Sequence, residues 1–264
     1  MTQSASVHDL SKKQIFQKAL ELRSSGKLYD LKDDTQDSGF RGSIDRFCEI
    51  AVRIRTARRV LDVGAGGGIL LSLLSELGHE CFAVDINDLP STLPGIFKEK
   101  GIDFKMCNVE AEPIPYPDNY FDAIVCCQAL EHFTHSHLPV MKEIHLKLRQ
   151  GGIVEVDVPN AVSFRNRSRM LRGKHITWDY EKHYLHTEPI QYNGRSYYPD
   201  RHNREFTLDE LVTLLKAAAF RNIEAYHLRS VRYRSGWDRL RTAGTFVRDT
   251  VPSMRKSLIA FAEK

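Results

Sequence analysis

Two kinds of hydrophobic pattern alternate along the first 159 residues. Short apolar runs, typical of buried strands, cover residues 59–63, 81–85, 104–107, 121–127 and 153–158. Segments with an apolar residue every three or four positions, typical of helices, cover residues 11–23, 43–57, 69–77 and 137–149. Strands that alternate with helices at this spacing predict a mostly parallel sheet with helices on both faces, an α/β fold.

The alternation stops after Pro159. Residues 160–206 are rich in Arg, His and Tyr and show no clear period. Thr207 and Glu210 then form a capping-box pattern that opens a helix, and two late strands are expected at 222–228 and 257–262. We expect an N-terminal helical cap over 1–57 with a loop at 26–39, and one domain over 58–264 that carries 160–206 as an insertion.

The composition fits an ordinary globular protein. The chain has 264 residues, of which 42% are hydrophobic and 27% charged, which excludes wholesale disorder. Five cysteines in a chain of this length do not make a disulfide framework, so we expect reduced core cysteines and a cytoplasmic location. No run of ~18 apolar residues exists to span a membrane, and the start lacks the apolar core of a signal peptide.

The net charge of +4 is unevenly distributed. Residues 1–159 carry 18 Lys and Arg against 23 Asp and Glu, whereas residues 160–264 carry 20 against 11. A second basic stretch lies at 229–241. A basic half is typical of a face that meets an anionic partner, although solvated helix faces would give the same count.

A glycine loop follows the strand at 59–63. In the sequence VLDVGAGGG, which ends at Gly68, glycines let the backbone pass close under a ligand, and the next helix offers free N–H groups. Ile69 stands where a dinucleotide-binding loop needs its third glycine, which disfavours a nicotinamide site. Asp85 ends the second strand, 21 residues after Gly64, where an acid can accept hydrogen bonds from both ribose hydroxyls. A plain tight turn is the alternative.

Four segments in order carry a family resemblance: LDVGAGGG, AVDIN, NVEAEPIPYPDNYFDAIVCCQALEHF and LRQGGIVEVDVPN. Together they cover about residues 58–160 and resemble the class I S-adenosylmethionine-dependent methyltransferases of the type 11 kind. The resemblance implies S-adenosyl-L-methionine as the cofactor. It also implies a Rossmann-like sheet of seven strands, mostly parallel, with the last strand antiparallel.

The resemblance also implies a set of cofactor-binding positions. Asp62 and the glycines would contact the methionine part, Asp85 the ribose, and Ile86 the adenine. Asn108 stands where the family often has Asp beside the adenine amino group, and Gln128 would line the methionine end. The full set is Asp62, Gly64, Ala65, Gly66, Asp85, Ile86, Asn108, Val109 and Gln128.

The residues after the fourth strand, Gln128 to Phe133, would face the transferred methyl group. Some relatives have Glu-x-x-Glu-His here and bind a divalent metal. This chain has Gln128 at the first position, a neutral and weaker ligand, so we expect no metal. His132 is the candidate general base for a hydroxyl acceptor, with His202 as the substitute. The alternative is that His132 only supports the loop by hydrogen bonding.

The absence of several known motifs narrows the class of molecule that could accept the methyl group. No Asn-Pro-Pro-Tyr, Pro-Cys nucleophile or paired-glutamate loop follows the fourth strand, which argues against methylation of DNA bases and of protein arginine. A small molecule, sugar or phosphate-bearing glycan remains, with O-methylation as the expected reaction. A quinone, lipid or natural product is the nearest variant, and a non-catalytic RNA-binding module is the alternative of a different class.

The insertion combines arginines with tyrosines, which suit phosphates and sugar rings. Its Asn-rich start after the fifth strand, an Arg-x-x-x-x-Gly stretch and its closing His-x-Arg-Glu-Phe-Thr resemble methyltransferases of bacterial surface polysaccharides. We expect 160–206 to form a lid over the methyl donor, with Arg201 and Arg204 near an anionic acceptor. The alternative is that the insertion only packs on the sheet and closes the cofactor cavity.

Overall fold

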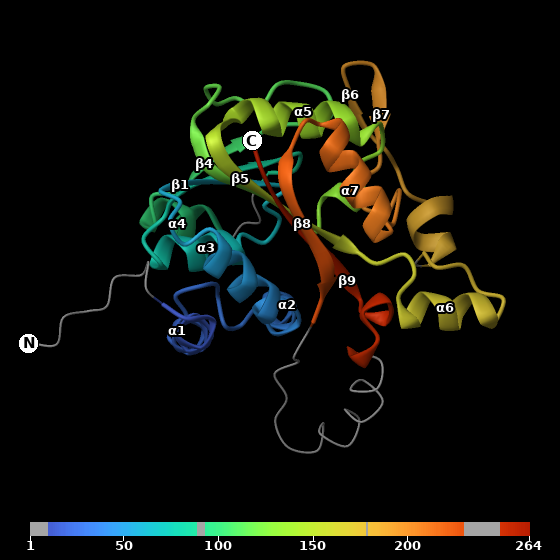
Figure 1. The fold of residues 1–264 in the computed structure, drawn as a ribbon, viewed down its shortest axis with the longest axis horizontal. Coiled ribbons are helices and arrows are strands. Elements are labelled where there is room, and N and C mark those ends of the chain that lie inside the picture. Colours follow the sequence, from blue (N-terminus) through green and yellow to red (C-terminus); the bar gives the residue numbers. More distant parts are fainter. Residues whose placement is uncertain (1–9, 89–92, 178, 230–248) are drawn as a thin grey trace, which may run out of the picture.

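The computed structural model describes residues 10–88, 93–177, 179–229 and 249–264. Seven strands form one sheet in the order β3-β2-β1-β4-β5-β9-β8 (Figure 1). Their bounds are β1 Arg59–Val63, β2 Glu80–Asp85, β3 Asp103–Met106, β4 Phe121–Cys127, β5 Leu148–Pro159, β8 Arg221–Leu228 and β9 Ser257–Glu263. Only β9, the last strand, runs antiparallel to both its neighbours within this sheet. The predicted fold class is therefore confirmed.

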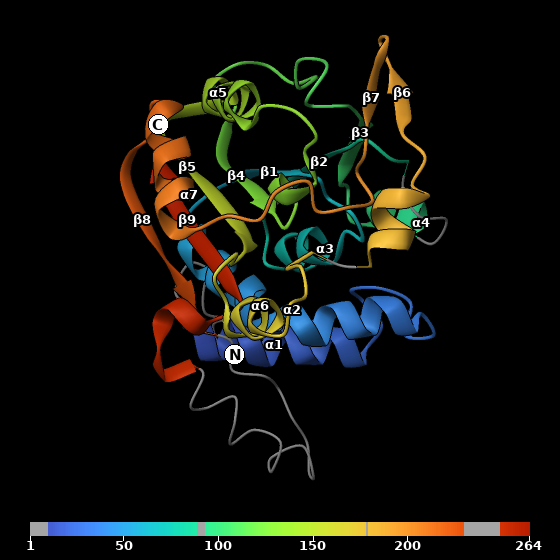
Figure 2. The same cartoon turned by 90° about the vertical axis from the view of Figure 1, so that its right-hand side faces the viewer.

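Helices cover both faces of the sheet (Figures 1 and 2). One hydrophobic cluster joins α1, α2 and α3 to one face, and a second joins α5 and α7 to the other. The helices are α1 Lys12–Ser24, α2 Asp34–Arg53, α3 Ile69–Glu76, α4 Leu93–Glu99, α5 His137–Lys147 and α7 Leu208–Ala217. The predicted capping box of α7 is present, with the Thr207 side chain accepting from the Glu210 N–H.

The loop predicted at 26–39 was wrong over its second half, because α2 begins at Asp34. The Asp33 side chain accepts from the N–H groups of Thr35 and Gln36 and so starts the helix. Asp37, which looked like a loop residue, is buried and accepts from Arg23 and from the Tyr29 hydroxyl. These partners satisfy its charge inside the helical cap.

Two further boundaries differ from the sequence-based expectation. The predicted helix 137–149 ends at Lys147, and β5 begins at Leu148, so the Gly151-Gly152 pair lies inside a strand. Helix α4 was not predicted. The late strands and the helices near residues 12, 44 and 69 lie where the apolar pattern placed them.

The insertion contains short elements that its sequence did not reveal. They are α6 Phe164–Leu171, the π-helix η3 Glu181–Leu185, and the hairpin β6 Ile190–Tyr192 with β7 Arg195–Tyr197. The segment returns to the sheet by an isolated bridge between Asn160 and Phe206. Trp178 and most of the basic stretch at 229–241 lie outside the described residues.

The five cysteines are free thiols, and only Cys127 is more than marginally exposed. No helix in the described ranges is both long and apolar enough to cross a membrane. The carboxyl ends of β1, β2 and β4 lie at one edge of the sheet, where an open α/β sheet binds its ligands.

Candidate cofactor and methyl-transfer site

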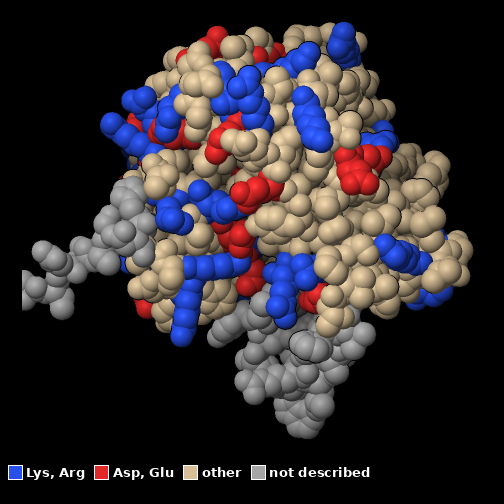
Figure 3. Space-filling view, viewed as in Figure 1, with Lys and Arg blue, Asp and Glu red and all other residues tan. Residues whose placement is uncertain are grey.

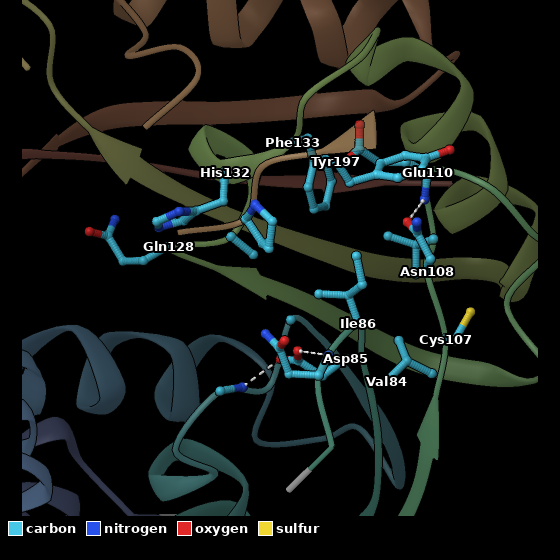
Figure 4. Close-up of a pocket in the computed structure, with 16 residues that line it drawn as sticks. Val84, Asp85, Ile86, Cys107, Asn108, Glu110, Gln128, His132, Phe133 and Tyr197 are labelled. Carbon is cyan, nitrogen blue, oxygen red and sulfur yellow. Dashed lines mark hydrogen bonds between the residues drawn. The ribbon is translucent and has the colours of Figure 1, made fainter. Parts of the chain in front are cut away.

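A cavity opens at the carboxyl ends of β1, β2 and β4 (Figure 4). Its walls come from the glycine loop, the end of β2, the turn after β3, the segment after β4, and the hairpin of the insertion. The lining residues are Gly64, Gly66, Val84, Asp85, Ile86, Asn87, Cys107, Asn108, Val109, Glu110, Gln128, Ala129, His132, Phe133, Tyr197 and Pro199. The structure thus brings together seven of the nine predicted cofactor residues, while Asp62 and Ala65 do not line the cavity.

The glycine loop lies too close to its surroundings for a side chain. Gly64 has φ +81°, and a Cβ there would approach the Cβ of Ala129 to 2.6 Å. Gly66 has φ +48°, and its N–H donates to Oδ2 of Asp85 over 3.0 Å. The loop is therefore pinned to the end of β2, and its backbone forms the floor of the cavity.

Asp85 holds the two sides of this floor together. Its Oδ1 accepts from the N–H of Asn87 at 2.9 Å, while Oδ2 accepts from Gly66. The carboxylate lines the cavity with Ile86 beside it (Figure 4). A ribose would meet an acceptor already oriented by two backbone donors, which fits the predicted role.

Asn108 shapes the turn that would receive the adenine. Its Oδ1 accepts from the N–H of Glu110 at 3.1 Å, and its own N–H donates to Glu112. The side chain is buried, and among the described residues its Nδ2 has no hydrogen-bond partner. A buried amide donor without a protein partner points to a ligand or water acceptor at this position.

Asp62 lies beneath the cavity in a layer of buried charge. Glu155 and Asp157 on β5 are fully buried, and Arg46 of α2 lies 3.4 Å from Oδ1 of Asp157. Gln128, at φ +53°, donates from Nε2 to the same Oδ1 at 2.6 Å. Burial raises the pKa of Asp62 and of Glu155, so a cationic ligand above this layer, such as a sulfonium or ammonium group, would favour the ionised form of these carboxyls.

The fold thus offers what S-adenosylmethionine needs: a glycine floor, a ribose acceptor and buried carboxyl groups near the methionine end. Sequence reasoning missed Arg46, Glu155 and Asp157. The available signal was a pair of acids inside the apolar run IVEVDV and an arginine among apolar helix positions. A buried charge in such a run implies a partner elsewhere in the chain.

His132 faces the cavity on the side opposite the adenine turn (Figure 4). Its Nδ1 lies 3.1 Å from the carbonyl oxygen of Arg201, which can only accept. A proton on Nδ1 would satisfy this contact and leave the lone pair on Nε2. Burial, followed by the neighbouring His202, lowers the pKa of His132 below its usual value, so the ring is neutral near pH 7.

His202 lies against His132, with ring centroids 4.9 Å apart and planes at 88°. Ligand atoms of Glu131, His132 and His202 lie within 4.8 Å of one another. The sequence named both histidines as candidate bases but could not show that their rings touch, because they lie 70 positions apart. The absence of a metal stays a prediction, and the chelator experiment in the Discussion tests it.

Neither predicted acceptor arginine lines the cavity. The Arg201 guanidinium lies over the ring of Tyr198 at 4.0 Å, and its Nε donates to Asn203 at 2.8 Å. Arg204 pairs with Glu210 at the start of α7 and keeps a half-exposed side chain. Of the two arginines, Arg201 has the closer connection to the cavity. Its carbonyl oxygen contacts His132, and it follows Pro199 of the cavity wall by two residues.

Asp62 is expected to make the cofactor-free protein less stable as pH rises. Burial, then Asp85 and Asp157, raises the pKa of Asp62 to about 8, against an ordinary value of 3.8. Between these values the folded state binds more protons than the unfolded state, so the free energy of unfolding falls with rising pH. Asp62→Asn cannot ionise and should flatten the dependence in thermal melts across this range. An unchanged slope would refute the burial argument.

The strand order of the sheet, and a cavity at the carboxyl ends of β1 and β4, where the strand order reverses, are those of a class I S-adenosylmethionine-dependent methyltransferase. The protein belongs to this class. The comparisons agree. A family model described as a methyltransferase domain matches residues 35–225, and the chain belongs to this family. The family is one of methyltransferases that use S-adenosyl-L-methionine as the methyl donor.

Several curated relatives are quinone-pathway enzymes. The chain is 32% identical over 137 residues to a ubiquinone/menaquinone biosynthesis C-methyltransferase of Nitrosospira multiformis, covering 50% of this chain and 56% of the relative. It is 27% identical to the Pseudomonas fluorescens enzyme of the same name, covering 62% and 70%. The chain thus spans little more than half the length of the first relative.

Solved structures share the fold at low identity. A 1,6-didemethyltoxoflavin-N1-methyltransferase of Burkholderia thailandensis, bound to S-adenosylhomocysteine, has a TM-score of 0.55 at 19% identity, covering 97% of this chain and 91% of the other. A methyltransferase of Archaeoglobus fulgidus has a TM-score of 0.51 at 17% identity, covering 87% and 98%. These likenesses support the fold and carry no information about the acceptor.

Proposed function

We propose that the enzyme transfers a methyl group from S-adenosylmethionine to a hydroxyl oxygen of a small anionic acceptor, such as a sugar or a phosphate-bearing glycan. The observation that carries the proposal is the position of His132 in the cavity wall. Its Nε2 lone pair belongs to a neutral ring that lines the cavity next to Gln128. A hydroxyl nucleophile needs a base of this kind, whereas sulfur and amine nucleophiles need it less.

The chain's own residues would divide the work as follows. The bound cofactor supplies a methyl group on a sulfonium, which is a good leaving group. Asp85 and the glycine loop would fix the cofactor, and His132 would take the acceptor's proton at Nε2 as the oxygen attacks the methyl carbon. The Arg201 carbonyl would hold the imidazole in orientation through Nδ1–H. Phe133 and Tyr197 would exclude water from the reacting centre.

A second candidate is a quinone or another lipid-like aromatic acceptor. The names of the curated relatives favour it, and Phe133 and Tyr197 give the cavity an aromatic wall. Labelled S-adenosylmethionine with a panel of nucleotide sugars, phosphorylated sugars and reduced quinones would separate the candidates. We expect an O-methylated product from an anionic sugar. A product methylated at carbon would favour the quinone candidate instead.

Arg201→Gln should raise the KM for an anionic acceptor on the order of tenfold to a hundredfold, because a charge-assisted hydrogen bond contributes about 1.5–3 kcal/mol. The KM should also rise with salt, since charges in contact with water are screened.

Arg204→Gln is the matched control, since that guanidinium pairs with Glu210 at the start of α7, whereas Arg201 contacts His132 of the cavity wall through its carbonyl oxygen. We expect it to leave the acceptor KM unchanged. If Arg204 rather than Arg201 controls the KM, the acceptor approaches from the α7 side, and our assignment of Arg201 is wrong. Cofactor affinity should be equal in both variants.

A further inference from the structure

Helix α6 exposes its apolar side chains and buries a polar one. Phe164, Met170 and Leu171 are 51%, 66% and 89% exposed, and Asn166 is the only buried residue of the helix. A helix on the surface of a globular protein normally turns its apolar stripe toward the core. In α6 the apolar side chains are therefore available to something outside this chain.

The outward orientation of α6 is fixed by polar contacts. Nδ2 of Asn166 donates to Oε2 of Glu205 at 2.6 Å and to the carbonyl oxygens of Asn160 and Ala161. The Ser163 side chain caps the helix by accepting from the Asn166 N–H. These bonds attach α6 to the end of β5 and to the close of the insertion, so the helix presents one defined face.

The same segment carries positive charge without acidic partners. Residues 160–178 contain five basic residues and no Asp or Glu: Arg165, Arg167, Arg169, Arg172 and Lys174. Within the described part of the chain, none of the five forms an ion pair with a carboxylate. Some donate to backbone carbonyls instead, as Arg167 does to Val162 at 2.6 Å and Arg169 to His175 at 2.7 Å.

Exposed apolar side chains are concentrated here. Among the described residues, six of the ten large apolar side chains classed as exposed lie between 162 and 185. In Figure 3 the lower right of the molecule, over α6, is largely tan with Lys and Arg groups in blue. Clustered apolar side chains among basic ones mark an interaction site rather than ordinary surface.

We propose that residues 162–174, which we name the α6 surface, dock the enzyme on an anionic lipid surface. Phe164 and Leu171 are seven residues apart and so lie on one side of the helix, where both can insert among acyl chains. The five basic residues would lie at the level of the anionic headgroups. A nucleic acid fits less well, because Met170 and Leu171 offer neither charge nor an aromatic face for stacking bases.

The position of the α6 surface suits a membrane-bound acceptor. Helix α6 begins five residues after β5 ends, and β5 runs parallel to β4, whose carboxyl end leads into the cavity wall at Gln128. The same insertion contributes Tyr197 and Pro199 to the cavity wall. Docking through α6 would bring the cavity near the lipid surface. The proposal does not depend on which atom of the acceptor is methylated.

The test is co-sedimentation of the full chain with phosphatidylcholine vesicles, with and without phosphatidylglycerol. We expect binding only with phosphatidylglycerol and release at high salt. Arg165→Gln with Arg172→Gln should weaken the partition on the order of tenfold or more. Met170→Ser with Leu171→Ser should also weaken it, because these side chains are mostly exposed and their loss should spare the fold.

Matched control variants remove the same kinds of side chain from parts of the protein outside the α6 surface. Lys13→Gln with Lys18→Gln takes two charges from α1, and Leu31→Ser with Leu146→Ser takes two exposed apolar side chains from other surfaces. These controls should bind vesicles like the parent, and all variants should keep their melting temperature. No binding to anionic vesicles, equal loss in the controls, or salt-sensitive binding to single-stranded RNA in place of vesicles would overturn the proposal.

Discussion

His132→Ala is expected to lower turnover on the order of 10²–10⁴-fold while leaving cofactor affinity nearly intact. The loss follows from removing the one imidazole that lines the cavity among the described residues, whose Nε2 would take the acceptor's proton. Because burial lowers the pKa of His132, the parent's rate should fall on the acidic side at a lower pH than for an ordinary histidine. That acidic limb should vanish in the variant. Rates of methyl transfer across pH would measure both effects.

His145→Ala is the control for this experiment, since His145 also has a burial-lowered pKa but lies on α5 outside the cavity. Its activity and pH profile should match those of the parent.

A chelator should have little effect on the activity of the parent or of either variant. Full activity in His132→Ala would show that His132 is not the general base. Activity abolished by chelator and restored by a divalent cation would assign Glu131, His132 and His202 to a metal instead.

Asp85→Ala should weaken S-adenosylmethionine binding on the order of tenfold to a hundredfold. Without the carboxylate, the ribose hydroxyls would lose their hydrogen-bond acceptor, and so would the N–H groups of Gly66 and Asn87. Asp85→Asn keeps one acceptor oxygen and should show a smaller loss. Calorimetric titration measures the affinities directly.

Asp88→Ala serves as the control, because Asp88 is an exposed carboxylate three residues further along and does not line the cavity. Its cofactor affinity should equal that of the parent. Unchanged affinity in a folded Asp85→Ala protein would contradict the ribose assignment. The fold should survive each change, since both positions follow or end β2 at the surface of the sheet.

The sheet was predictable because most of its strands are local apolar runs and the turns between them carry their own signals. The capping box at Thr207 and the glycine loop at Gly64 are likewise read from adjacent residues. The loop error at 26–39 has the opposite cause. Asp37 is helical and buried because Arg23 and Tyr29 bind it, and no local pattern shows those partners.

The candidate site also has a part that local sequence predicts and a part that depends on residues far apart in the chain. The floor formed by Gly64, Gly66 and Asp85 follows from sequence order along two adjacent strands. The pairing of His132 with His202, and of Arg46 with Asp157, joins residues far apart in the chain. Helix α6 was hidden for another reason: an inward apolar stripe is the usual signature of a helix, and α6 does not have one.

The most direct test of the account is a crystal structure of the enzyme with S-adenosylhomocysteine. We predict the ribose hydroxyls on the carboxylate of Asp85 and the adenine between Ile86 and the turn at Asn108. The sulfur should face Gln128 and His132, above the buried Asp62. A complex in which the nucleoside lies outside this cavity, or in which Asp85 makes no contact with the ribose, would contradict the account.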